Sequence, residues 1–329
     1  MKVIILGGTG NISKSIVRLL LKQGYDVTCY NRGISGHLLE DVCHIKGDRN
    51  NRESFEKVMK KGKFDVAIDM ICFNREDAVS SYKAFKEVEY YIYCSTVCTY
   101  GIKLDWLPVS EDHPLRPIND YGRGKAEAER FFLEVYYREN FPVTIIRPST
   151  TYGTLQAMVR QVSRDFPDYS WIDRIRKGKP ILICGDGKAI HQFLHVDDAA
   201  KGFVGAIGKE HCKGQIYNLV NRGYVTWEEY HKIAMKVLGV EVELVGIPLN
   251  NLLKFDNKRF YITKELYAYN GYYDSDKIFR DIPEFTPKIT LEEGMKQVFI
   301  YMDQQNMIPN SDQLTWEDNL IQAQRQVGK

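Results

Sequence analysis

The feature that most restricts the fold of this sequence is a glycine-rich turn close to its start. A short apolar run, Lys2 to Leu6, leads directly into Gly7-Gly-Thr-Gly-Asn-Ile-Ser13. Apolar residues then recur with helical spacing from Ile12 to Leu20, which predicts an amphipathic helix. Strand, glycine turn and helix in this order are the setting of a dinucleotide-binding fingerprint, because glycines let the backbone approach a pyrophosphate and helix amides attract it. A tight turn without a ligand is the alternative, and Ser13 stands where a third glycine is usual.

Further strand-like runs alternate with helical stretches through the first half of the sequence. Strands are predicted at 27–30, 42–46, 64–69, from Tyr91 onward and at 143–147, and helices at 51–60 and 76–87. This alternation predicts an α/β fold, a Rossmann-type doubly wound parallel sheet that binds ligands at its carboxyl edge.

A different pattern follows Gly153 and indicates a smaller C-terminal α/β substrate lobe. It contains a strand at 180–184 and two capping boxes, Thr226 to Glu229 and Thr290 to Glu293. Asp197 or Asp198 is the expected N-cap of another helix. The predicted division is 1–153 with a segment near 190–220 for the dinucleotide-binding domain, about 154–190 and 221–310 for the substrate lobe, and 311–329 for a peripheral tail.

The end of the second predicted strand bears on the choice of cofactor. Asn31-Arg32-Gly33 stands about where an Asp or Glu would bind the ribose of NAD. An arginine can instead bind a 2′-phosphate through charge-assisted hydrogen bonds, so Arg32 favours NADP over NAD unless it is a solvated loop cation. Asp48, after the third strand, can accept a hydrogen bond from the adenine amino group.

A second group of residues predicts acid/base chemistry. The strand beginning at Tyr91 ends in small hydroxyl residues that include Thr96, and a helix capped by Asp120 carries Tyr121 and Lys125 at i and i+4. A lysine ammonium beside a phenol stabilises the phenolate and makes the tyrosine a usable base. Such pairs also arise by chance on exposed helices, so the argument depends on the neighbouring motifs.

Composition narrows the class of protein. The chain has 329 residues, a formal net charge of +2 and dispersed basic residues, which makes a nucleic-acid partner unlikely on electrostatic grounds. Seven cysteines without framework spacing favour reduced thiols in the cytoplasm. No apolar run approaches the length of a membrane span, and no metal site is predicted.

Taken together, these motifs resemble the extended short-chain dehydrogenase/reductase family, the NAD-dependent epimerases and dehydratases. Ser95-Thr-Val-Cys-Thr-Tyr-Gly101, Tyr121-x-x-x-Lys125 and Arg147-Pro148 to Gly153 are similar to the family's catalytic and nicotinamide segments. The resemblance implies catalytic roles for Thr96, Tyr121 and Lys125. The cofactor-binding residues it implies, with those argued above, are Gly7, Thr9, Gly10, Asn11, Ile12, Asn31, Arg32, Asp48, Arg49, Tyr121, Lys125 and Pro148.

Three details modify this expectation. The glycine turn with Asn31-Arg-Gly33 looks most like an atypical branch that includes chloroplast stem-loop RNA-binding proteins, whose members often lack the catalytic Tyr and Lys present here. Val97-Cys98 replaces the Asp-Glu pair of family dehydratases. Cys98 falls where some epimerases of the family hold a cysteine base. The alternative to this catalytic role is a buried thiol that packs at the strand end. His191 stands where sugar-nucleotide members of the family commonly have an arginine that contacts the substrate diphosphate. The tentative substrate contacts are Thr96, His191 and Arg160.

The resulting prediction is a sugar-nucleotide epimerase that works by transient hydride transfer to NADP or NAD. An NADPH-dependent keto-sugar reductase is the first alternative, and a non-catalytic dinucleotide- or RNA-binding member is the second. A cytoplasmic homodimer, formed through helices near 76–87 and 121–137, is expected from the resemblance.

Overall fold

The computed structural model of the protein describes residues 1–34, 41–155 and 158–327, and its chain forms two compact units. Unit 1 comprises Met1–Thr151, Leu194–Arg222 and Tyr273–Lys288, and unit 2 comprises Tyr152–Phe193, Gly223–Tyr272 and Ile289–Lys329. The return of Tyr273–Lys288 to unit 1 was not predicted, because its sequence carries no strand or glycine signal.

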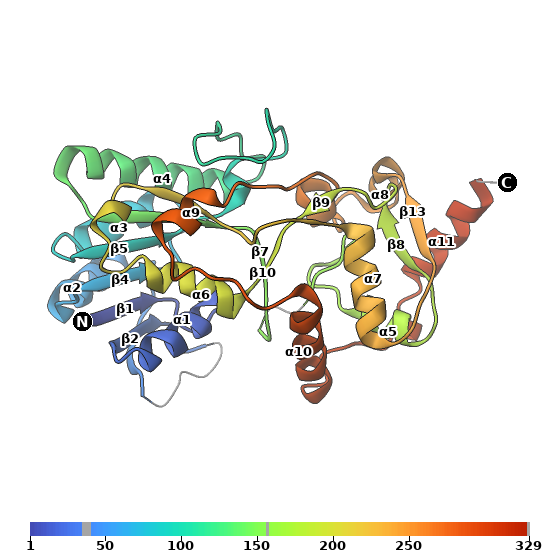
Figure 1. The fold of residues 1–329 in the computed structure, drawn as a ribbon, viewed down its shortest axis with the longest axis horizontal. Coiled ribbons are helices and arrows are strands. Elements are labelled where there is room, and N and C mark those ends of the chain that lie inside the picture. Colours follow the sequence, from blue (N-terminus) through green and yellow to red (C-terminus); the bar gives the residue numbers. More distant parts are fainter. Residues whose placement is uncertain (35–40, 156–157, 328–329) are drawn as a thin grey trace. The chain divides into compact units, whose positions relative to one another are not determined.

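Unit 1 is built on a parallel sheet that has seven strands in the described residues, in the order β11-β6-β5-β4-β1-β2-β3 (Figure 1). The strands are β1 Lys2–Leu6, β2 Asp26–Asn31, β3 Cys43–Lys46, β4 Val66–Asp69, β5 Tyr90–Cys94, β6 Val143–Pro148 and β11 Ile216–Leu219. The order reverses between β1 and β4, as in a doubly wound sheet. The predicted α/β Rossmann-type fold is confirmed.

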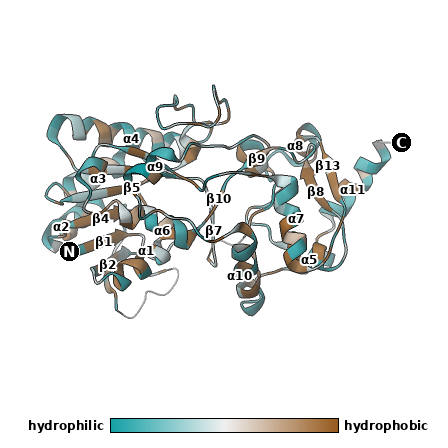
Figure 2. Ribbon diagram, in the orientation of Figure 1, coloured by the Kyte–Doolittle hydropathy of each residue, from teal (hydrophilic) through white to brown (hydrophobic). Residues whose placement is uncertain are grey.

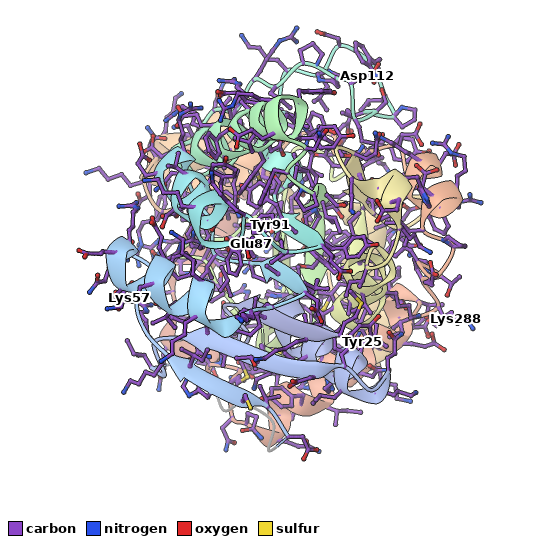
Figure 3. All side chains as sticks on the ribbon, turned by 90° about the vertical axis from the view of Figure 1, so that its left-hand side faces the viewer. Tyr25, Lys57, Glu87, Tyr91, Asp112 and Lys288 are labelled. Carbon is purple, nitrogen blue, oxygen red and sulfur yellow. The ribbon has the colours of Figure 1, made fainter. Side chains whose placement is uncertain are left out.

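Helices cover both faces of this sheet. Apolar side chains of α1 (Asn11–Lys22), α6 (Val196–Gly205) and α9 (Asp276–Asp281) pack on one face, and those of α2 (Arg52–Gly62), α3 (Arg75–Ala84) and α4 (Asp120–Glu139) pack on the other. Hydrophobic residues fill β1 and β4, whereas α4 alternates between hydrophobic and hydrophilic residues (Figure 2). Tyr91 accordingly lies inside unit 1, while Lys57 and Asp112 lie on its outside (Figure 3). Short helices η1 (Val97–Thr99) and η2 (Glu210–Cys212) complete unit 1.

Unit 2 is smaller and mostly helical. The chain passes between the units at β7 (Thr150–Tyr152) and β10 (Phe193–His195). In unit 2, β8 pairs with β13 in parallel and β9 pairs with β12 antiparallel. Its elements are α5 Ser170–Arg176, β8 Ile181–Cys184, β9 Ile190–His191, β12 Val225–Thr226, α7 Trp227–Leu238, β13 Leu244–Ile247, α8 Leu249–Asp256, η3 Thr263–Tyr267, α10 Leu291–Gln304, η4 Ser311–Gln313 and α11 Trp316–Val327.

The capping signals read from the sequence were partly right. Both predicted capping boxes, at Thr226 and Thr290, are present. The N-cap of α4 is Asn119 rather than Asp120, and the N-cap of α6 is His195, whose Nδ1 accepts from the Asp197 amide, rather than Asp197 or Asp198. Each error is a shift along a polar run in which several residues can cap.

The C-terminal segment is part of the unit 2 core and not a peripheral tail. Trp316, Leu320 and Ile321 of α11 are buried against residues of β8 and β13. The carboxylate of Glu317 is also buried, where it accepts from Arg160 and from the Leu182 amide. The segment was predicted to be peripheral because its composition is polar, but its apolar residues lie on a single face of α11.

None of the helices in the described ranges has the length and apolar character that crossing a membrane requires.

Candidate active site

A pocket of about 380 Å³ opens in unit 1 at the carboxyl ends of β1, β2, β3 and β4. Seven residues predicted to bind a cofactor line it: Gly7, Thr9, Gly10, Asn31, Arg32, Asp48 and Arg49. Ile71, Phe73 and Asp77 form more of its wall. A doubly wound sheet binds its ligand at this edge, beside the point where the strand order reverses.

The glycine turn is shaped for close approach of its backbone. Gly7 has a φ of +85°, and a Cβ there would lie 2.5 Å from Cγ2 of Ile71. A Cβ on Gly8 would lie 2.3 Å from the sulfur of Cys29. Gly10 is the N-cap of α1 and offers no capping side chain, so the first amides of the helix remain available to an anion. The glycine turn therefore fits the pyrophosphate of a dinucleotide. Asn11 and Ile12 follow in the first turn of α1.

The end of β2 is cationic. Oδ1 of Asn31 accepts hydrogen bonds from the Gly33 amide at 2.8 Å and from His44 Nε2 at 2.9 Å. Arg32 is exposed and forms no ion pair with any residue in the described ranges. Asp48, across the pocket, accepts from the Asn50 amide at 2.9 Å through Oδ1.

Arg49 supports the pocket wall from behind instead of presenting its guanidinium to a cofactor. It is buried and donates to both oxygens of Asp69, at 3.0 and 3.1 Å, and to the Asp77 carbonyl. The Asp69 carboxylate in turn accepts from the Ile71 amide, and the Asp77 carboxylate accepts from the Phe73 amide, both at 3.0 Å. The expected cofactor contact by Arg49 is therefore corrected to a structural role.

Thr96 and Tyr121 meet beside this pocket. Thr96 follows β5, and its Oγ1 accepts from the Cys98 amide at 3.2 Å, which starts η1. Tyr121 lies in the first turn of α4, and the Thr96 side chain is close enough to its hydroxyl to lower the pKa of the phenol. Phe73 lies between the pocket and Tyr121, since it lines the pocket and its ring centroid lies 6.4 Å from that of Tyr121.

Lys125 is buried one turn further along α4. Its ammonium donates to the Cys94 carbonyl at 2.6 Å and lies 5.8 Å from the centroid of the Tyr121 ring. Burial raises the pKa of Tyr121 above its ordinary value, Cys94 and Cys98 raise it further, and the nearby Thr96 hydroxyl lowers it. The expected lowering by Lys125 is not among these causes, and the ammonium donates to the Cys94 carbonyl instead of the phenol.

Two other expected residues lie close to this pair. The Cys98 thiol is half-buried and close enough to Tyr121 to raise the pKa of the phenol. Pro148 is buried at the carboxyl end of β6. Cys98 is therefore positioned for proton transfer only if a substrate reaches the strand end.

The two tentative substrate contacts of unit 2 are buried. Arg160 is inaccessible and donates to both oxygens of Glu317, at 2.8 and 2.5 Å. His191 is enclosed by Phe193, Trp227 and Tyr267, and burial lowers its pKa to about 4. A neutral, enclosed imidazole and a guanidinium already paired do not suit contacts with a diphosphate, so both assignments are corrected.

Nowhere in the described residues do three or more His, Cys, Asp or Glu side chains gather as metal ligands would.

The chain was compared with known protein families and curated proteins. A model of the NAD dependent epimerase/dehydratase family matches residues 3–83 and 77–219. The chloroplast stem-loop binding protein of 41 kDa b from Arabidopsis thaliana is 27% identical over 312 residues, which cover 89% of this chain and 77% of that protein. The 2′-dehydrokanamycin reductase of Streptomyces kanamyceticus is 24% identical over 249 residues, 75% of this chain and 70% of that protein.

Solved structures are similar in fold. A UDP-glucose 4-epimerase from Thermotoga maritima, solved with UDP-glucose, superposes with a TM-score of 0.74 at 21% identity over 93% of this chain and 100% of that one. A UDP-glucuronic acid 4-epimerase from Bacillus cereus, solved with UDP-glucuronic acid and NAD, gives 0.73 at 20% identity with the same coverage. Since the family model spans well over half of the sequence, the chain belongs to the NAD dependent epimerase/dehydratase family of enzymes.

Proposed function

We propose that this protein is a nucleotide-sugar epimerase that oxidises and re-reduces its substrate with a nicotinamide dinucleotide, using Thr96, Tyr121 and Lys125. The observation that carries the proposal is the approach of the Thr96 hydroxyl to the Tyr121 phenol beside the glycine-lined pocket. A hydroxyl pair at this place can bind one substrate oxygen from two sides. The solved epimerases of similar fold bind UDP-sugars, which supports a nucleotide sugar as the substrate class.

Each residue has a distinct part in this reaction. When bound, the nicotinamide supplies reversible acceptance of a hydride. Tyr121 accepts the proton of the substrate hydroxyl and later returns it, while Thr96 donates a hydrogen bond to the same oxygen. Lys125 contributes a buried positive charge that favours the phenolate form of Tyr121 once a ligand draws the ammonium from the Cys94 carbonyl.

An NADPH-dependent keto-sugar reductase is the second candidate, and Arg32 is the observation that favours it. An exposed arginine without an ion-pair partner in the described residues suits the 2′-phosphate of NADPH, the usual reductant. The relative named 2′-dehydrokanamycin reductase supports this reaction class. Within the proposal, the cofactor is NADP or NAD, with NADP favoured by Arg32.

Cys98 offers a second proton acceptor for epimerisation next to a keto group. Removal of a carbon-bound proton by its thiolate would exchange that hydrogen with solvent. Turnover in deuterium oxide separates the routes, because direct hydride return leaves the product unlabelled and a Cys98 base introduces deuterium.

The remaining expectations also belong to the proposal. We expect a cytoplasmic homodimer in which α3 and α4 form the contact, as the family resemblance implies.

The first experiment is identification of the dinucleotide that copurifies, followed by titration of the stripped protein with NAD, NADP and their reduced forms. Retained NAD supports the epimerase, and an empty site that prefers NADPH supports the reductase. If the protein binds none of these dinucleotides, both the epimerase and the reductase proposals are wrong. That result would favour a non-catalytic protein, in keeping with the stem-loop binding relative.

A further inference from the structure

A buried ion pair lies directly behind the Thr96–Tyr121 contact. Arg147 of β6 and Glu129 of α4 are 2% and 1% exposed. Two parallel hydrogen bonds join them: Nε donates to Oε1 at 2.9 Å and Nη2 donates to Oε2 at 2.5 Å. This bidentate geometry restricts both distance and orientation, which a single bond would not do.

The pair is connected to both members of the candidate catalytic contact. Glu129 follows Lys125 by four residues, and Lys125 follows Tyr121 by four, so all three share one face of α4. The Ser95 hydroxyl donates to Oε1 of Glu129, and Ser95 immediately precedes Thr96. A continuous chain of bonds therefore runs from the strand that carries Thr96 to the helix that carries Tyr121.

Arg147 also holds the segment that follows Thr96. Its Nη1 donates to the Tyr100 hydroxyl at 2.7 Å and to the Glu111 carbonyl at 3.1 Å. The Tyr100 hydroxyl donates in turn to Oδ1 of Asn218 at 2.7 Å. One guanidinium thus connects β6 to α4 and to the loop 101–119.

The energetics argue for a positional role. Burying a charged pair gains little net stability over well-packed apolar residues, because desolvation offsets much of the attraction. Such a pair does, however, impose a defined geometry on the elements that it joins. Here the ion pair joins β6 to α4, and the Ser95 hydroxyl joins the end of β5 to the same glutamate, so the pair fixes Glu129 as the anchor between the Thr96 and Tyr121 segments.

We propose that Ser95, Glu129 and Arg147 form a positioning clamp that holds the strand end carrying Thr96 against the helix carrying Tyr121. The proposal rests on the function given above for Thr96 and Tyr121. None of the three clamp residues contacts the substrate in this account, so they act only through the residues they position.

The test uses Ser95→Ala, because loss of either charged partner would leave an unpaired buried charge and could unfold the protein. Ser80→Ala is the matched control: its hydroxyl donates to Glu56 at 2.9 Å, between α3 and α2, well apart from Thr96 in the chain. The readout is the Cζ resonance of Tyr121 in protein labelled with ¹³C-tyrosine, at neutral pH. Tyr121→Phe assigns this resonance among the 21 tyrosines.

We expect Thr96→Val to move the Tyr121 resonance, Ser95→Ala to move it in the same direction by a smaller amount, and Ser80→Ala to leave it in place. An unmoved resonance in Ser95→Ala, or in Thr96→Val itself, would overturn the clamp. The spectrum needs no substrate or cofactor. Failure to turn over nucleotide sugars would therefore count against the proposed function and leave this result standing.

Discussion

The Thr96 side chain lies close enough to the phenol of Tyr121 to lower its pKa, although the two residues come from different elements, the end of β5 and the first turn of α4. In the proposed reaction this hydroxyl helps to bind the oxygen that Tyr121 deprotonates. Thr96→Val should therefore lower kcat by about tenfold or more, since one oriented hydrogen bond is lost from the transition state. Thr96→Ser keeps the hydroxyl and should retain most of the activity. Equal losses in both variants would assign Thr96 a packing role, and steady-state kinetics on the accepted sugar decides between them.

Arg32 should determine the choice between the two dinucleotides. A charge-assisted bond to the 2′-phosphate is worth about 1.5–3 kcal/mol, so Arg32→Ala should weaken NADP binding by about ten- to a hundredfold and leave NAD binding nearly unchanged. Titration calorimetry of the stripped protein measures both constants. Arg130→Ala, an exposed arginine on α4, is the control for loss of one surface charge. If Arg32→Ala weakens the binding of NAD and of NADP to the same extent, Arg32 does not bind the 2′-phosphate.

Two buried histidines should make unit 2 sensitive to acid. Burial lowers the pKa of His191 to about 4 and that of His231 to about 3, from an ordinary value of 6.5. The folded state therefore binds fewer protons than the unfolded state below pH 6.5, and stability that is complete above pH 6.5 is lost as the pH falls. The expected loss is about 1.4 kcal/mol per pH unit for each histidine.

Urea unfolding between pH 6.5 and 5 measures this slope. Tryptophan fluorescence is a suitable probe, because Trp171, Trp227 and Trp316 are all buried in unit 2. His231→Phe should remove its share of the slope, and substitution of the exposed His44 by Gln should change nothing. A slope that is unchanged in His231→Phe would rule out a contribution from this residue.

The buried pair of Arg160 and Glu317 should be essential for the stability of unit 2. Glu317→Gln removes the carboxylate that pairs with two buried arginines, Arg160 and Arg174, leaves Arg160 with the longer 3.5 Å pair to Asp168, and should cost about 3–5 kcal/mol of unfolding free energy. Glu292→Gln removes a carboxylate from an exposed pair with Lys236 and should cost less than about 1 kcal/mol. Similar losses in both variants, measured by urea unfolding, would show that burial of the first pair does not matter.

Residues that act through local geometry could be predicted from the sequence. The glycine turn, the apolar strands and the shared helix face of Tyr121 and Lys125 all follow from short-range patterns, because residues at i and i+4 share a helix face. The helix starts at Asn119 and His195 were missed by a few residues, since several neighbouring side chains can cap.

Residues whose role depends on distant partners could not be predicted. Arg160 looked like a substrate contact because its partner, Glu317, lies 157 residues further along the chain. Glu129 and Ser95 were missed for the same reason, since nothing local marks a glutamate as the partner of Arg147. Arg49 was named among the cofactor-binding residues, and only burial against Asp69 reveals its structural role.

The most direct test of the proposed function compares wild type with Tyr121→Phe on a panel of UDP-sugars, with NAD and NADP each added, and ¹H NMR to detect epimers. Tyr137→Phe, a largely exposed tyrosine on the same helix, is the control. The account predicts that wild type and Tyr137→Phe convert at least one sugar, and that Tyr121→Phe binds the dinucleotide normally but is slower by about a hundredfold or more. Turnover by Tyr121→Phe at the wild-type rate would contradict the central claim.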